Sequence, residues 1–181
     1  MKKTIILAIT IMFSTYSQAQ LAIGKDEVTN DFVSLEFAEN ENRGLLLPWV
    51  DNETAVSSAE LGTLIYDADE KKVKVKYTDG WKDLSIKEGT TIHPTTGIDA
   101  LDIQTPLTEN SDAKVSIGEP NPNVDGILVL EDTDKAMVLP KVTAPHDNIL
   151  NPTPGLMVYD PTAKEFAVFN GESWTFWKPQ D

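Results

Sequence analysis

Histidine and cysteine limit the chemistry that this chain can perform. It contains two histidines, His93 and His146, and no cysteine, which excludes thiol nucleophiles and thiolate metal sites. A zinc site or a serine–histidine–aspartate relay needs a histidine among neighbouring ligands or beside a positioned nucleophile. His93 lies in a stretch rich in threonine, glycine and proline, and His146 directly follows Pro145. We therefore predict no catalytic residue and expect that the protein is not an enzyme.

Carboxylates are the most numerous reactive groups, with 29 Asp and Glu residues against 15 Lys and Arg. Two clusters offer the oxygen ligands that calcium prefers: Asp67, Asp69 and Glu70, and Glu131, Asp132 and Asp134. Neither follows the calcium-loop pattern, and aspartate is common in turns because its side chain binds nearby backbone amides. We expect solvated turns, no metal site and no cofactor. A small hydrolase with paired carboxylates is the least favoured alternative, because short meanders seldom form the cleft that two catalytic acids must share.

Tryptophans are the remaining candidates for recognition. Trp81 and Trp174 each follow a predicted turn, and we expect both to pack in the core, where an aromatic side chain buries roughly 150–250 Å². Trp49 and Trp177 have no counterpart elsewhere in the chain. We predict that these two are the partner-binding residues, if any tryptophan contacts a partner.

The N-terminus has the layout of a secretory signal peptide over residues 1–19. Two lysines precede an apolar run from Ile5 to about Phe13, and a polar stretch then ends at Ala19. The apolar run is about half the roughly 20 residues that a membrane-spanning helix needs. We expect cleavage before Gln20, export to the extracellular space or the cell surface, and no membrane insertion of the mature chain; the periplasm is an alternative location. The formal net charge of −14 would repel phosphate backbones, so we do not expect nucleic acid as a partner.

The chain repeats a series of short phrases at offsets of 92 to 94 residues. The matched landmarks are Ile23-Gly24 and Ile117-Gly118, Leu47-Pro48 and Leu139-Pro140, Gly62 and Gly155, Tyr66-Asp67 and Tyr159-Asp160, and Trp81 and Trp174. Such self-similarity indicates duplication of a structural unit. We predict a first β-repeat over residues 20–85, a linker over 86–114 with one short strand near Ile98 to Ile103, and a second β-repeat over 115–181.

Local patterns within each repeat favour strands. "VKVKYTDGW" alternates apolar and lysine residues before Asp79-Gly80, and "FAVFNGESW" places Asn170-Gly171 at the corresponding turn; alternation and such dipeptides are typical of β-hairpins. The sequence therefore predicts an all-β fold of two homologous small modules, each built on a short antiparallel meander, with a short helical turn after Pro48 in the first. A unit of this size buries little apolar surface alone, and a second copy would provide a surface to pack against.

The order of these phrases resembles that of secreted surface proteins of the Bacteroidetes. The residues that carry the resemblance are "QLAIG", "GLLLPWV", "GTLIYD" and "YTDGW", then "VSIG", "MVLPKV" and "GLMVYDPTAKEFAVFNGESW". Similar units occur in fibre-like proteins, including phage tail-fibre segments. The resemblance implies a surface or extracellular location and a structural or binding role, and it implies no active site. The arginine that usually follows Leu-Pro in that family is replaced here by Trp49 and Lys141.

Taken with the acidic, cysteine-free composition, these patterns predict a secreted or cell-surface structural and interaction protein. We expect it to be a non-catalytic subunit or binder in an envelope or extracellular assembly, with a protein partner or with copies of itself. The alternative is a secreted carbohydrate-binding module with a polysaccharide partner.

Overall fold

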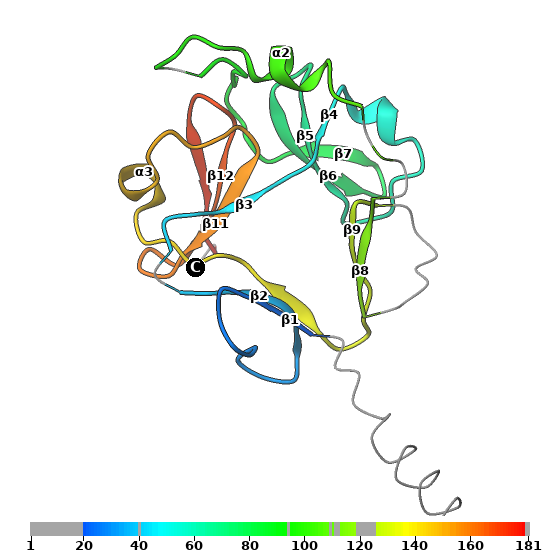
Figure 1. Ribbon diagram of the computed structural model, residues 1–181, viewed down its shortest axis with the longest axis vertical. Coiled ribbons are helices and arrows are strands. Elements are labelled where there is room, and N and C mark those ends of the chain that lie inside the picture. Colours follow the sequence, from blue (N-terminus) through cyan, green and yellow to red (C-terminus); the bar gives the residue numbers. More distant parts are fainter. Residues whose placement is uncertain are drawn as a thin grey trace, which may run out of the picture.

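A computed structural model of the chain describes residues 20–39, 41–93, 95–108, 110, 113–118 and 126–179. The predicted signal peptide lies outside these residues. Within them, most regular structure is β-strand arranged in four sheets, with a few very short helices (Figure 1). This confirms the predicted all-β class, whereas the homology of the two modules stays a prediction. None of the described helices combines the length and the apolar character needed to cross a membrane.

Two four-stranded sheets form the centre of the molecule. The first has the strand order β4 (Trp49–Val50), β5 (Leu64–Asp67), β6 (Lys72–Tyr77) and β7 (Gly80–Asp83). The second has the order β13 (Trp174–Trp177), β12 (Glu165–Phe169), β11 (Leu156–Asp160) and β3 (Leu45–Leu46). The runs β5–β6–β7 and β11–β12–β13 are antiparallel, as the alternating apolar pattern predicts.

The hairpin between β6 and β7 turns one residue earlier than expected. Tyr77 pairs with Gly80, so Thr78 and Asp79 form the loop and Gly80 begins the next strand rather than closing the turn. In the second meander Asn170 shapes the turn, because its side-chain Oδ1 accepts hydrogen bonds from the backbone N–H groups of Glu172 at 3.0 Å and Ser173 at 2.8 Å. Asparagine often stabilises turns in this way.

Two smaller sheets contain parallel strand pairs that the local patterns did not predict. One has the order β1 (Leu21–Ile23), β2 (Val33–Phe37) and β10 (Ala136–Val138), and β2 is parallel to both neighbours. The other contains β8 (Val115–Ile117) and β9 (Leu128–Leu130), which are also parallel. Parallel pairing joins segments across an intervening connection, so periodicity within one segment cannot reveal it.

Each of the two Leu-Pro phrases, Leu47-Pro48 and Leu139-Pro140, joins segments that pair in different sheets. Leu45 and Leu46 pair with β11, and Trp49 and Val50, beyond Pro48, pair with β5. The carbonyl oxygen of Pro48 accepts from the Tyr66 N–H at 2.9 Å. Proline ends each strand as expected, since it lacks the N–H that a central strand must donate.

The second phrase is arranged in the same manner. Before Pro140, strand β10 pairs with β2, which belongs to the other repeat; after it, Lys141 forms a parallel bridge with Tyr159. The carbonyl oxygen of Pro140 accepts from the Tyr159 N–H at 2.9 Å. Each phrase thus pairs first with the other half of the chain and then with its own half.

Helices are few and very short. A 3₁₀ turn, η1 (Glu53–Val56), follows Asn52, whose side chain accepts from the Thr54 N–H, and this confirms the predicted helical turn in the first repeat. α3 (Pro145–Asn148) is a single turn in the second. The strand predicted near Ile98 to Ile103 is wrong: that stretch contains α2 (Ala100–Gln104), because the Asp99 side chain accepts from the Leu101 N–H and caps a helix there.

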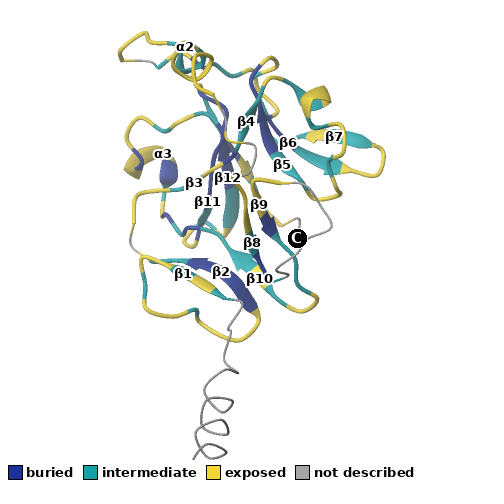
Figure 2. Cartoon of the chain, turned by 45° about the vertical axis from the view of Figure 1, so that its right-hand side comes forward, coloured by how far each residue is buried: buried dark blue, intermediate teal, exposed yellow. Residues whose placement is uncertain are grey.

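The two central sheets share one hydrophobic core. Tyr66 and Val73 from the first sheet pack with Met157 and Val168 from the second, and Leu47 lies among them. A second cluster lies on the other side of β11 and β12: Val142, Ile149, Leu156, Val158, Ala167 and Phe169. Figure 2 shows the buried residues gathered on strands, with mostly exposed loops around them. Neither half of the chain therefore completes its apolar packing alone.

Candidate functional site

The first acidic cluster is organised around a lysine. The Lys74 ammonium lies 3.0 Å from a carboxylate oxygen of Glu53, 2.8 Å from Asp67 and 2.9 Å from Glu70. Asp67 is completely buried and Lys74 nearly so. Burial favours the uncharged form of Asp67, but hydrogen bonds from the Glu70 N–H and from Lys74 outweigh it and lower the pKa of this carboxyl. Burial acts against the charged form of Lys74 too, and the three carboxylates nevertheless raise its pKa.

The position of Lys74 bears on whether the first acidic cluster could bind calcium. Glu53, Asp67 and Glu70 present one oxygen each within 4.8 Å of one another, a spacing that a metal ion could bridge. The Lys74 ammonium contacts all three carboxylates. Its single positive charge lies among the three carboxylates and offsets one of their three negative charges. Asp69, which the sequence placed with the cluster, is not part of this group.

Asp160 occupies the matching place in the second half without a lysine. Its carboxylate accepts hydrogen bonds from the backbone N–H groups of Ala144 at 2.9 Å, Thr162 at 2.8 Å and Ala163 at 3.0 Å. Burial again opposes ionisation, but these hydrogen bonds lower the pKa of Asp160. Asp67 is bound similarly by the backbone N–H groups of Glu53 and Glu70. Both aspartates thus fix the chain that follows a Leu-Pro phrase to the end of a central strand.

The second acidic cluster contains an ion pair of its own. Lys135 lies 2.9 Å from Asp132 and 3.6 Å from Asp134. The hydrogen bond from Lys135 lowers the pKa of Asp132. One carboxylate oxygen of Glu131 is buried without a hydrogen-bond partner among the described residues.

The two histidines differ in their surroundings, because His93 lies in a loop whereas His146 lies in α3 and contacts a strand. Nδ1 of His93 accepts from the backbone N–H groups of Thr95 and Thr96, each at 3.2 Å. The His146 ring lies edge-on to Phe176 with ring centroids 5.7 Å apart, and its Nε2 is 3.5 Å from a carboxylate oxygen of Asp147. These contacts position no nucleophile.

Trp49 and Trp177, the predicted partner-binding residues, each join one half of the chain to the other. The Trp49 indole N–H donates to the carbonyl oxygen of Pro154 at 2.8 Å, and the Trp177 indole N–H donates to that of Leu84 at 3.0 Å. Both side chains are partly exposed. Their indole donors are thus used within the chain, and a role in partner binding stays a prediction.

The matched Trp81 and Trp174 differ in their surroundings. Trp174 packs against the second core cluster, with its ring centroid 5.3 Å from that of Phe169. Trp81 instead has the Lys76 ammonium 5.6 Å from its ring centroid, a cation–π contact at a partly exposed position. The expectation of core packing thus describes Trp174 and not Trp81.

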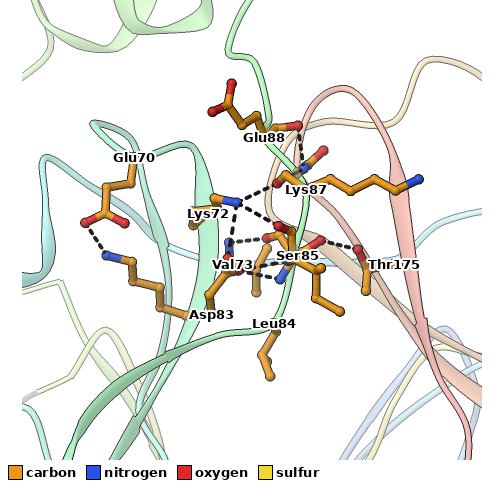
Figure 3. A network of polar contacts seen from close by, with 12 residues as sticks. Glu70, Lys72, Val73, Asp83, Leu84, Ser85, Lys87, Glu88 and Thr175 are labelled. Carbon is orange, nitrogen blue, oxygen red and sulfur yellow. Dashed lines mark hydrogen bonds and ion pairs between the residues drawn. The ribbon is translucent and has the colours of Figure 1, made fainter.

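The start of the predicted linker is held between the two central sheets. Figure 3 shows the Ser85 side chain accepting a hydrogen bond from the Val73 N–H, at 2.7 Å, while its backbone oxygen accepts from the Thr175 hydroxyl. Two residues further on, the carbonyl oxygen of Lys87 accepts from the Lys72 ammonium at 2.7 Å. Residues 85–91 therefore act as a fixed connection between the sheets.

Asn170 completes the junction that residues 85–91 form between the two central sheets. The turn prediction did not include this role. The Asn170 side-chain N–H groups donate to the carbonyl oxygens of Lys87 at 2.8 Å and Glu88 at 3.0 Å. Its own carbonyl oxygen accepts from the Tyr66 hydroxyl at 3.1 Å and from the Thr90 N–H at 3.2 Å. The Asn-Gly dipeptide marks the turn in the sequence, but its distant partners carry no sequence signal.

Open strand edges are the remaining surface feature. Within the described residues, β4 and β7 end the first central sheet, β13 and β3 end the second, and β8 and β9 pair only with each other. Several apolar side chains beside these edges are exposed, among them Val115 and Leu128. Unpaired backbone groups beside exposed apolar side chains are suited to pairing with another chain. No catalytic arrangement emerges from the described residues, so these edges form the candidate interaction site.

Comparison with known proteins points in the same direction. Residues 116–180 match the family model of a phage tail like trimerisation region. The matched segment includes most of β8 and all of β9 to β13, and it covers less than half of the 181 residues. No curated protein and no solved structure gave a significant match. The match supports self-association and a non-catalytic, fibre-like structural role for this segment.

Proposed function

We propose that this protein is a structural component of a fibre-like assembly that associates with copies of itself, as a trimer, outside the cell or at its surface. The observation that carries the proposal is the match of residues 116–180 to a trimerisation region. The open, partly apolar strand edges offer surfaces for such association. The Lys74 ammonium contacts all three carboxylates of the first acidic cluster, and neither histidine lies beside a positioned nucleophile in the described part of the chain, which fits a non-catalytic role.

The oligomeric state tests the proposal directly. Light scattering coupled to size-exclusion chromatography should give three times the mass of one chain, over a wide range of protein concentration. Sedimentation equilibrium provides an independent mass. A single-chain mass at every concentration would rule out the trimer and with it the proposed role.

Export is a separate part of the proposal and needs its own experiment. It rests on the signal-like composition of residues 1–19. N-terminal sequencing of the protein recovered from the outside of expressing cells should begin at Gln20. Recovery only from the cytoplasm, with Met1 or Lys2 still present, would contradict export while leaving the trimer intact.

A further inference from the structure

The two parallel ladders of this protein share their geometry but not their number of strands. In the first, the Ala38 N–H donates to the carbonyl oxygen of Ile23 at 2.8 Å; in the second, the Glu131 N–H donates to that of Ile117 at 3.1 Å. In both, a glycine with positive φ directly follows the first strand. The pairs β1–β2 and β8–β9 are thus two versions of one structural element.

The first ladder has a third strand that the second lacks. β10 adds to the free side of β2, with Met137 opposite Leu35 and Val138 opposite Glu36. Within the described residues, no strand adds to the corresponding side of β9. The offset of 93 residues that relates Tyr66 to Tyr159 places Leu128 and Val129 at the corresponding positions on β9.

The backbone of β9 is suitable for a third strand. Ile127 and Glu131 direct their carbonyl and N–H groups, respectively, toward β8. Backbone groups alternate sides along a strand, so the N–H and C=O groups of Leu128 point toward the open edge. The Leu128 residue is 39% exposed, although it lies in a strand whose neighbour Val129 is buried.

The equivalent of β10 in the first half of the chain is β3. Both strands directly precede a Leu-Pro pair, Leu47-Pro48 in one case and Leu139-Pro140 in the other. One side of β3 pairs with β11, and β3 ends that sheet. Leu46, on this edge strand, is 48% exposed. β3 is therefore a strand of the required kind with a side available.

We propose that β3 of a second copy of this chain adds in parallel to the open edge of β9, as β10 adds to β2 within one chain. Leu45 of one copy would lie opposite Leu128 of the next. Residues 44–47 and 126–130 contain no charged side chain, so the contact avoids repulsion between two copies that each carry a formal charge of −14. Strand addition of this kind is a general mode of protein association.

The proposed contact also determines the symmetry of the assembly. β3 and β9 are different surfaces, so each copy offers one to the preceding copy and the other to the next. Such head-to-tail contacts generate a closed ring when the rotation closes, and three identical contacts close a trimer. The inference rests on the proposed trimer and specifies which strands form it.

Paired cysteines test this contact, because the natural chain contains none. The double variant Leu45→Cys with Leu128→Cys should form covalent dimers and trimers on oxidation, seen on a non-reducing gel. Neither single variant should form covalent trimers on oxidation, because each lacks the second thiol of the contact. The double variant Leu35→Cys with Met137→Cys places cysteines at the same register of the observed β2–β10 pair; it is the positive control and should cross-link only within one chain.

A second pair of variants works without new covalent bonds. Leu128→Lys would place a charge at the proposed contact. It should raise the dissociation constant of the trimer by at least about tenfold. Ile103→Lys is the matched control, since Ile103 is 58% exposed and lies on α2, outside the strand edges, and it should leave the trimer intact. A trimer that forms without the Leu45–Leu128 cross-link and tolerates Leu128→Lys would overturn this inference and leave the proposed function standing. A protein that never trimerises would overturn the proposed function itself.

Discussion

The buried carboxylates of Asp67 and Asp160 have partly different partners in the two halves of the chain. Asp67 and Asp160 both accept backbone N–H donors that fix the segment after a Leu-Pro phrase. Only Asp67 also has a buried lysine, and Ala167 stands where the first half has Lys74. The backbone donors are therefore the shared feature, and the ammonium is an addition specific to the first half.

Replacing Lys74 should test the energetic importance of that addition. Lys74→Met keeps much of the side-chain volume but leaves the buried Asp67 carboxylate without its ammonium, which should cost about 3 kcal/mol of unfolding free energy. Urea denaturation at neutral pH gives the value. Lys76→Met, two residues along the same strand, is the control and should cost less than about 1 kcal/mol. Equal effects of the two substitutions would show that the ion cluster contributes little.

Glu36 gives the protein a specific response to acid. Its carboxylate accepts from the Thr29 N–H and hydroxyl, each at 2.6 Å, and lies 3.0 Å from the Lys25 ammonium. Burial tends to raise the pKa of Glu36, but these contacts lower it from 4.5 to about 2. The stabilisation from Glu36 is therefore complete above pH 4.5 and is lost as the pH falls toward 2, amounting to about 3 kcal/mol.

Glu36→Gln should accordingly lose less stability than the natural protein between pH 4.5 and pH 2. Urea denaturation at several pH values in this window measures the difference. The exposed Glu27→Gln serves as the control and should retain the steep acid dependence. If Glu36→Gln showed the same dependence as the natural protein, the carboxylate would not be responsible for it.

Elements of this fold depend on close approach of distant backbone segments. Gly171 has φ of +100°, and a β-carbon there would overlap the carbonyl oxygen of Thr90, whereas Gly62 has φ of +88° with open space around it. The segment at residues 85–91 can therefore contact the β12–β13 turn only because glycine occupies position 171.

Substitution by alanine separates the two requirements at these glycines. Gly62→Ala introduces backbone strain alone and should cost about 1–2 kcal/mol. Gly171→Ala adds the overlap and should cost several kcal/mol more, because it displaces the connection between the sheets. Thermal and urea unfolding compare the two variants. Similar losses at both positions would mean that the junction relaxes without cost.

The elements also show how far sequence patterns determine this structure. Both meanders were predictable because alternation and turn dipeptides act between residues close in the chain. The pairing of β3 with β11 and of β10 with β2 was not predictable, since short apolar runs such as Leu45–Leu47 fit many partners. The Asp99 side chain caps a helix at a place where the sequence pattern indicated a strand. The internal contacts of Trp49 and Trp177 likewise depend on distant carbonyl groups that no local motif specifies.

The two halves of the chain are interlocked over the residues that the structure describes. Strand β3 of the first half pairs with β11 of the second, and β10 of the second half pairs with β2 of the first. One core cluster contains residues of both halves. A fragment of residues 20–91 lacks β10 and half of the shared core. We expect it to be unfolded, with no dispersed amide signals in its NMR spectrum. Mixing it with residues 92–181 should restore the dispersion; a well-folded isolated fragment would contradict the interlocked arrangement.

The pairing of β3 with β11 also affects how the chain acquires its structure. Leu45 meets Met157, so much of the polypeptide must be available before this early segment finds its neighbour. Folds dominated by such distant contacts form slowly, because closing a long loop costs entropy before any contact forms. While a ribosome synthesises the protein, β3 would therefore stay unpaired and accessible until β11 has been made, in a form that chaperones can bind.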